Sequence, residues 1–130
     1  MPLKSTIAKA RKDAAEGKSP STQAGEFVHE EIDRIRKGEH GARSAKQAIA
    51  IGLSEARRAG VDLPPPKNAS PEVQKKAAQD SKAAASHKKV SRKRSQAATK
   101  ALKGESSESV SHSALSRQAR SAARKRSKAR

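Results

Sequence analysis

The sequence predicts an all-α fold, in which a small helical hairpin is followed by a basic, partly disordered and conditionally helical tail. Two segments between residues 19 and 63 carry apolar side chains at helical spacing, and both have helix start and stop signals. After residue 70 the chain is rich in Ala and Lys, which favour helix, but it has almost no large apolar side chains to form a core face. A single aromatic residue, Phe27, among 130 residues limits the chain to one small core.

Four parts follow from this pattern: a basic N-terminal arm over 1–18, a hairpin module over 19–63, a proline-rich spacer over 64–70 and a basic Ala/Lys/Ser-rich tail over 71–130. The arm lacks a clear apolar stripe, so we expect a frayed segment or a short helix. The three prolines of residues 64–66 stop the preceding helix and favour a stiff, extended spacer.

Each helix of the hairpin has recognisable ends. Ser19 and Pro20 are typical of an N-cap followed by the first helical residue, and Gly38 is suited to a left-handed C-cap, which predicts a helix over about 20–37. Ser44 and Gln47 match a capping box, and Gly60 provides the next C-cap, which predicts a second helix over about 45–59.

The apolar faces of these two helices predict how they pack. Gly52 lies among apolar residues, so we expect it to allow close approach of the other helix. Because a core of about 45 residues is near the lower limit for independent folding, we also expect dimerisation or packing against a later helix. The predicted helix-packing residues are Phe27, Val28, Ile32, Ile35, Ile49, Gly52 and Leu53.

Within the tail, Ser70 and Pro71 repeat the helix start signal. We expect conditional helix from there, with a break near 86–91, because the segment has high helix propensity and no core face. Residues 104–113 are rich in Ser and Glu and predict a flexible link, and a last basic helix is expected over about 114–128.

Charge is distributed unevenly along the chain. Residues 21–63 contain seven Lys and Arg and seven Asp and Glu, whereas residues 64–130 contain eighteen basic and four acidic residues, a surplus of 14. Such a polycation favours a polyanionic partner, and nucleic acid is the commonest in a cell. The predicted nucleic-acid-binding residues are Lys88, Lys89, Arg92, Lys93, Arg94, Arg124, Lys125, Arg126, Lys128 and Arg130.

Other classes of function are disfavoured. The chain has no cysteine and its four histidines are scattered, so we expect no metal site and no cofactor. No phosphate-binding or nucleophile motif is present, so we expect no catalytic residues and no enzyme activity. No apolar run is long enough to span a membrane and no secretory signal is recognisable, so we expect no membrane partner and a cytoplasmic location, at the bacterial nucleoid.

Residues 46–60, KQAIAIGLSEARRAG, resemble a block that reads K-Q-A-I-A-I-x-L-S-E-A-R-x-A-G. That block is shared by an uncharacterised family of short basic proteins from bacteria and phages. The resemblance implies a bacterial or phage origin and a small helical module, and it transfers no catalytic residue.

The functional prediction is a DNA-binding protein that does not read sequence, nucleoid-associated or similar to histone H1, which contacts phosphates of double-stranded DNA through its tail. The absence of aromatic stacking platforms disfavours recognition of single strands. Two alternatives remain open: an RNA-binding or ribosome-associated factor, and an interaction adaptor whose hairpin recruits a protein partner. The hairpin is expected to supply this partner contact or to form a homodimer.

Overall fold

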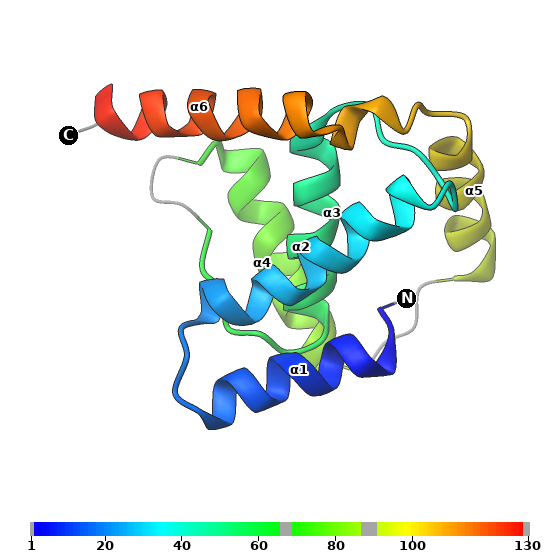
Figure 1. Ribbon diagram of the computed structural model, residues 1–130. Coiled ribbons are helices and arrows are strands. Elements are labelled where there is room, and N and C mark those ends of the chain that lie inside the picture. Colours follow the sequence, from blue (N-terminus) through cyan, green and yellow to red (C-terminus); the bar gives the residue numbers. More distant parts are fainter. Residues whose placement is uncertain (1, 66–68, 87–90, 129–130) are drawn as a thin grey trace. The chain divides into compact units, whose positions relative to one another are not determined.

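The computed structural model describes residues 2–65, 69–86 and 91–128, with the backbone alone at 85, 86 and 128. Every regular element in these residues is helical (Figure 1), which confirms the predicted all-α class. The elements are α1 (Lys4–Ala15), α2 (Pro20–Arg36), α3 (Ala45–Arg58), α4 (Pro71–Ser86), α5 (Arg92–Lys103), the 3₁₀ helix η1 (Glu108–Val110) and α6 (His112–Lys128).

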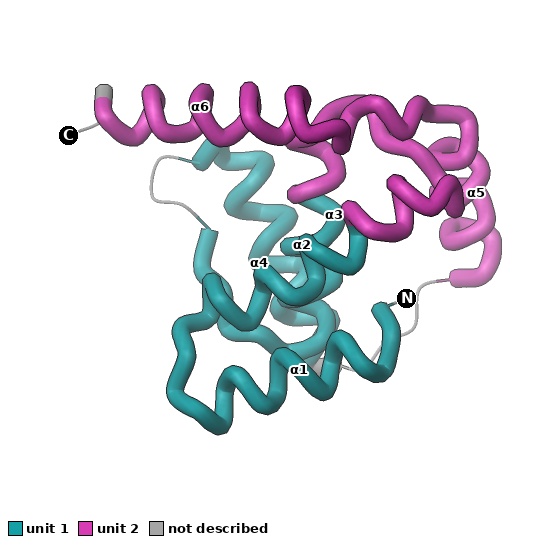
Figure 2. Tube along the Cα trace, viewed as in Figure 1, with its two compact units in different colours: residues 1–31, 50–90 teal, residues 32–49, 91–130 magenta. Residues whose placement is uncertain are grey.

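The chain forms two compact units (Figure 2). Unit 1 comprises residues 1–31 and 50–90, and unit 2 comprises residues 32–49 and 91–130. Both α2 and α3 cross from one unit into the other, because the boundaries fall between residues 31 and 32 and between 49 and 50. Each unit therefore combines residues of the predicted hairpin with residues that follow the three prolines.

Local signals explain the ends of the hairpin helices. The Ser19 hydroxyl accepts a hydrogen bond from the Thr22 N–H at 3.3 Å, and α2 begins at Pro20 as predicted. At the other end of α2, Gly38 has a φ of 83°, and the Glu39 N–H bonds back to the Arg34 carbonyl at 3.1 Å. This six-to-one bond is the Schellman arrangement, in which glycine adopts the left-handed conformation at no steric cost.

The second hairpin helix has the predicted caps as well. The Ser44 hydroxyl accepts from the Gln47 N–H at 3.1 Å, while the Gln47 side chain accepts from the Arg43 N–H at 2.6 Å. Gly60 has a φ of 104° and the Val61 N–H bonds to the Ala56 carbonyl at 3.0 Å, which closes α3 in the same way as α2. Helix α3 ends at Arg58, one residue before the predicted end.

Unit 1 has its own core. Phe27 of α2 is 1% exposed and packs with small residues of α1, α2 and α3 and with Val61, so the N-terminal segment is a packed helix rather than a frayed arm. Gly52 of α3 lies against α2: a methyl group added there would be 2.7 Å from the Val28 Cα atom. Leu53 is partly buried against the same core.

Unit 2 has a second core, to which the C-terminal half of the chain contributes. Ile35, Ala42 and Ala48 from the hairpin pack with Val110 of η1, and Ile32 is partly buried beside them. Val110 is 0% exposed, and its carbonyl accepts a hydrogen bond from Arg36 Nε at 3.2 Å. Ile49, the last residue of the hairpin segment in unit 2, is half-buried.

The predicted arrangement of a simple hairpin followed by a separate tail is therefore wrong. The prediction fails because the Ser/Glu-rich segment is not a flexible link. Its Val110 is buried against the turn of the hairpin. The disorder expected in the tail is not confirmed, since three α-helices lie between residues 71 and 128. The predicted break near 86–91 lies largely outside the described residues.

Backbone contacts hold the end of α5 against the hairpin loop. The Gly41 N–H bonds to the Leu102 carbonyl at 2.8 Å, and the Ala42 N–H bonds to the Ser106 carbonyl at 3.0 Å. A Cβ atom at Gly41 would lie 1.9 Å from the Glu105 carbonyl oxygen, so only glycine allows the two loops to approach this closely.

Candidate nucleic-acid interface

The positive charge is concentrated in unit 2. Counting whole sequence ranges, unit 2 contains seventeen Lys and Arg and four Asp and Glu, a surplus of 13, whereas unit 1 contains thirteen basic and nine acidic residues, a surplus of 4. The positive surplus therefore lies in one compact unit, and that unit contains the loop of the hairpin as well as the C-terminal segment. A charge density of this kind creates a field that attracts polyanions.

Helix α5 presents a cluster of cations at its first turn. Ser91 caps the helix by accepting a hydrogen bond from the Arg94 N–H at 3.2 Å, and Arg92, Lys93 and Arg94 follow directly. All three side chains are exposed, and α5 has no buried residue. Cations in the first turn oppose the helix dipole, so an anion at this end would remove an unfavourable interaction.

Helix α6 carries a row of arginines. Arg117, Arg120 and Arg124 are spaced by three and four residues, which places them on one face of the helix, and all three are exposed. The row extends about 10 Å at 1.5 Å per residue. Lys125 and Arg126 are exposed as well, next to the end of this row.

The two predicted clusters are thus in one unit but not in one site. Arg92, Lys93 and Arg94 are at the start of α5, and Arg124, Lys125 and Arg126 are near the end of α6, at opposite ends of unit 2 (Figure 2). Lys88, Lys89 and Arg130 lie outside the described residues, and Lys128 is described by its backbone in α6 alone.

Ion pairing differs between unit 1 and the helices α5 and α6 of unit 2. In unit 1, Arg58 and Lys76 lie 2.9 and 3.4 Å from one carboxylate oxygen of Asp80, whose side chain is 1% exposed. In unit 2, none of the ten described Lys and Arg side chains between residues 92 and 126 is paired with a carboxylate of the described residues. The charges of α5 and α6 are thus available to an external anion.

The C-terminal end of α1 has a surface charge cluster of a different kind. The Lys18 ammonium group lies 3.3 Å from a carboxylate oxygen of Glu16 and 3.3 Å from one of Asp13. Hydrogen bonding to Glu16, then to Asp13, raises the pKa of Lys18 above its usual 10.5. This lysine is engaged in local pairing and is a poor candidate for a phosphate contact.

A groove in unit 2 contains basic residues that the sequence prediction did not include. It has a volume of about 550 Å³ and lies between the start of α3 on one side and η1 and α6 on the other. Arg43, Lys46 and Arg117 line it. Arg43 and Lys46 lie close to the capping residue Ser44 in the sequence. They were not predicted as binding residues, because residues 19–63 were assigned to a module without net charge.

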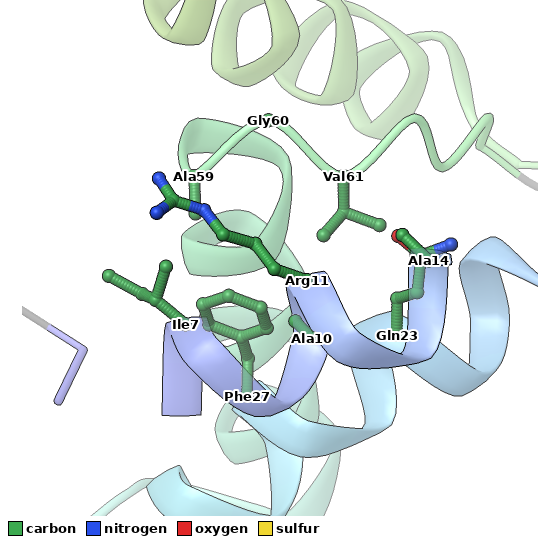
Figure 3. Close-up of a pocket in the computed structure, with 9 residues that line it drawn as sticks. All are labelled: Ile7, Ala10, Arg11, Ala14, Gln23, Phe27, Ala59, Gly60 and Val61. Carbon is green, nitrogen blue, oxygen red and sulfur yellow. The ribbon is translucent and has the colours of Figure 1, made fainter. Parts of the chain in front are cut away.

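A smaller pocket lies in unit 1 (Figure 3). It measures about 200 Å³, and Ile7, Phe27 and Val61 form its apolar wall, with Arg11 and Gln23 at its polar edge. Over the described part of the chain, no cluster of three or more His, Cys, Asp or Glu side chains is arranged to hold a metal ion. No helix in the same residues is long and apolar enough to cross a membrane.

Comparison with protein families gives a match over the hairpin segment. The profile of a family of unknown function (DUF6496) matches residues 19–67. No curated protein and no solved structure matches the chain. The matched region includes α2 and α3 and therefore Arg43 and Lys46, while α5 and α6 lie beyond it.

Proposed function

We propose that this protein binds double-stranded DNA without reading its sequence, through phosphate contacts made by unit 2, and that it acts as a nucleoid-associated protein in bacteria. One observation carries the proposal: unit 2 has a surplus of 13 positive charges, and the ten described Lys and Arg side chains of α5 and α6 are exposed and have no carboxylate partner among the described residues. Each such cation that meets a phosphate releases condensed counterions, which is the main source of sequence-independent affinity.

The choice of duplex over single strands follows from the aromatic content. Proteins that bind single strands stack bases on exposed aromatic side chains. Phe27 is the single aromatic residue of the sequence, and it is 1% exposed in the core of unit 1. Unit 2 therefore has cations for the phosphate backbone and no Phe, Tyr or Trp on which bases could stack, which favours a paired helix.

The test is a binding titration of the full chain with duplex DNA over a salt series. Truncation at residue 66 is unsuitable, because it removes Val110 from one core and Asp80 from the ion pairs of the other unit. The informative variant instead replaces six cations by Gln, and the set is Arg92, Lys93, Arg94, Arg124, Lys125 and Arg126. A control variant of equal charge loss replaces Lys4, Lys9, Lys12, Lys75, Lys82 and Arg11.

We expect the affinity of the unaltered chain to fall steeply with salt. In the six-residue variant, the slope of log K against log salt should decrease by about 0.9 for each phosphate that the protein no longer neutralises. The control should retain most of the slope. Absence of binding to duplex DNA in dilute buffer would refute the proposal and favour the adaptor function. Tighter binding to RNA than to DNA would favour the ribosome-associated function. Equal affinity for heparin and for duplex DNA would contradict a preference for DNA and indicate general binding of polyanions.

A further inference from the structure

The groove in unit 2 joins residues that are distant in sequence. One wall is formed by the loop before α3 and the first turn of that helix, and the other by η1 and the first half of α6. Both walls belong to the same compact unit, and Val110, which follows the η1 residues that line the groove, is anchored in its core. The lining residues are Ala42, Arg43, Ser44, Ala45, Lys46, Ser106, Glu108, Ser109, Ala114, Arg117, Gln118 and Ser121.

The chemistry of this lining suits a phosphodiester. Arg43, Lys46 and Arg117 are exposed cations, and none of them is paired with a carboxylate of the described residues. Four serines and a glutamine add neutral hydrogen-bond donors, and apolar lining is limited to three alanines. Guanidinium, ammonium and hydroxyl donors are the groups with which proteins contact the phosphate oxygens of DNA.

The groove also opens onto a path of charge along α6. Arg120 and Arg124 follow Arg117 at three and seven residues, so the same face of the helix continues from the groove toward the basic end of α6. The row from Arg117 to Arg124 is about 10 Å long, which corresponds to about three phosphates of one strand along the duplex axis. A strand seated in the groove can therefore extend to Arg124 without leaving basic surface.

We propose that this groove is a phosphodiester-binding site, in which Arg43 and Lys46 of the hairpin and Arg117 of α6 hold one strand of a DNA duplex. The inference rests on the proposed DNA-binding function and adds to it a defined location. It also gives the hairpin, predicted to supply only dimerisation or a protein contact, a direct part in binding DNA. Glu108 is the single acid among the lining residues, and it opposes the phosphates.

The first experiment compares two triple variants of the full chain in duplex titrations at several salt concentrations. The groove variant is Arg43→Gln, Lys46→Gln, Arg117→Gln, and the control variant is Lys4→Gln, Lys9→Gln, Lys75→Gln, which removes three exposed cations of unit 1. We expect the groove variant to lose about 3 from the salt slope and about eightfold in affinity for each phosphate released at 100 mM salt. The control should lose less than one from the slope.

The second experiment tests for a gain in affinity, which misfolding of the variant cannot explain. Glu108→Gln removes the opposing carboxylate and should tighten binding by up to about eightfold at 100 mM salt. Glu105→Gln is the matched control, because Glu105 is exposed in the loop just before η1 but does not line the groove, and its effect should be smaller.

The outcomes separate the two proposals. If the unaltered chain binds duplex DNA but the groove and control variants behave alike, or Glu108→Gln has no larger effect than Glu105→Gln, the groove is not the site and the proposed function stands. If the unaltered chain fails to bind duplex DNA, the proposed function is overturned and the groove assignment with it. A selective loss in the groove variant together with a selective gain in Glu108→Gln supports the site.

Discussion

Replacing Gly52 by Ala places a methyl group where α2 and α3 are closest. The added carbon would be 2.7 Å from the Val28 Cα atom and 3.0 Å from both the Val28 backbone nitrogen and its Cγ2 atom. Carbon atoms in contact prefer separations of about 3.5 to 4.0 Å. Two of the three neighbouring atoms belong to the backbone, so the helices must move apart by nearly 1 Å, because no side-chain rotation can relieve the contact.

Two effects of opposite sign compete in this variant. Alanine is a better helix former than glycine by about 1 kcal/mol. Forcing a methyl group into a packed helix contact costs about 1 to 3 kcal/mol. We therefore expect the free energy of unfolding of Gly52→Ala to be lower than that of the unaltered chain by up to about 2 kcal/mol.

Gly25 provides a matched control. It is in the interior of α2, it is exposed, and nothing lies within 4 Å of a Cβ atom added there. Gly25→Ala keeps the gain in helix propensity without the packing cost and should stabilise the protein by about 0.5 to 1 kcal/mol. The difference between the two variants thus isolates the packing term, at about 1 to 3 kcal/mol.

The assay is urea unfolding followed by circular dichroism at 222 nm, with equal slopes required before the free energies are compared. The decisive quantity is the difference in the free energy of unfolding between Gly52→Ala and Gly25→Ala. If Gly52→Ala is as stable as Gly25→Ala, the close crossing of α2 and α3 at Val28 is not present, and the interpretation of Gly52 as a packing glycine fails.

Three further predictions concern other parts of the molecule. Val110→Ala removes two buried methyl groups and should lower stability by about 2 kcal/mol and accelerate amide exchange in unit 2, whereas Val73→Ala, at a side chain that is 49% exposed, should change it by less than about 0.5 kcal/mol. Equal effects of the two would contradict the core of unit 2. Ser91→Ala removes the cap of α5 and should weaken that helix by about 1 kcal/mol, seen as faster amide exchange in its first turn and no change in α3. Because the folded-state pKa of Lys18 is raised, its stabilising contribution is complete below pH 10.5 and is lost as pH rises through the folded-state value. The stability difference between the unaltered chain and Lys18→Met, measured by urea unfolding between about pH 9 and 12, should therefore shrink with pH, and a constant difference would be inconsistent with this account.

Local signals predicted most helix ends correctly. The Ser19, Ser44 and Ser70 hydroxyls each accept a backbone N–H three residues on, at 3.3, 3.1 and 3.3 Å, and Gly38 and Gly60 close α2 and α3. These interactions join residues within about five positions of each other, so a short window of sequence contains all the groups that form them.

The candidate site was predicted only in part from the sequence. Basic contact residues on α5 and α6 were predicted from composition, since a Lys/Arg-rich segment with almost no large apolar side chains has little surface to bury. The groove was not predicted, because Arg43 and Lys46 come from a segment with balanced charge. Arg117 comes from another segment, more than seventy positions away. Charge counted along the chain could not reveal charges that are brought together by folding.

By itself, the amino-acid sequence determined the helical class, the caps and the excess of positive charge, because propensity, capping and net charge depend on neighbouring residues or on composition. The tertiary structure decided that the core is divided between two units, that Val110 joins the hairpin turn, and that Gly41 lies against the Glu105 backbone. The hydrogen bond from Arg36 to Val110 spans 74 positions. Val110 lies among serines and glutamates, so no apolar periodicity in the sequence predicts that it is buried. Only the packing of distant segments selects which side chains meet.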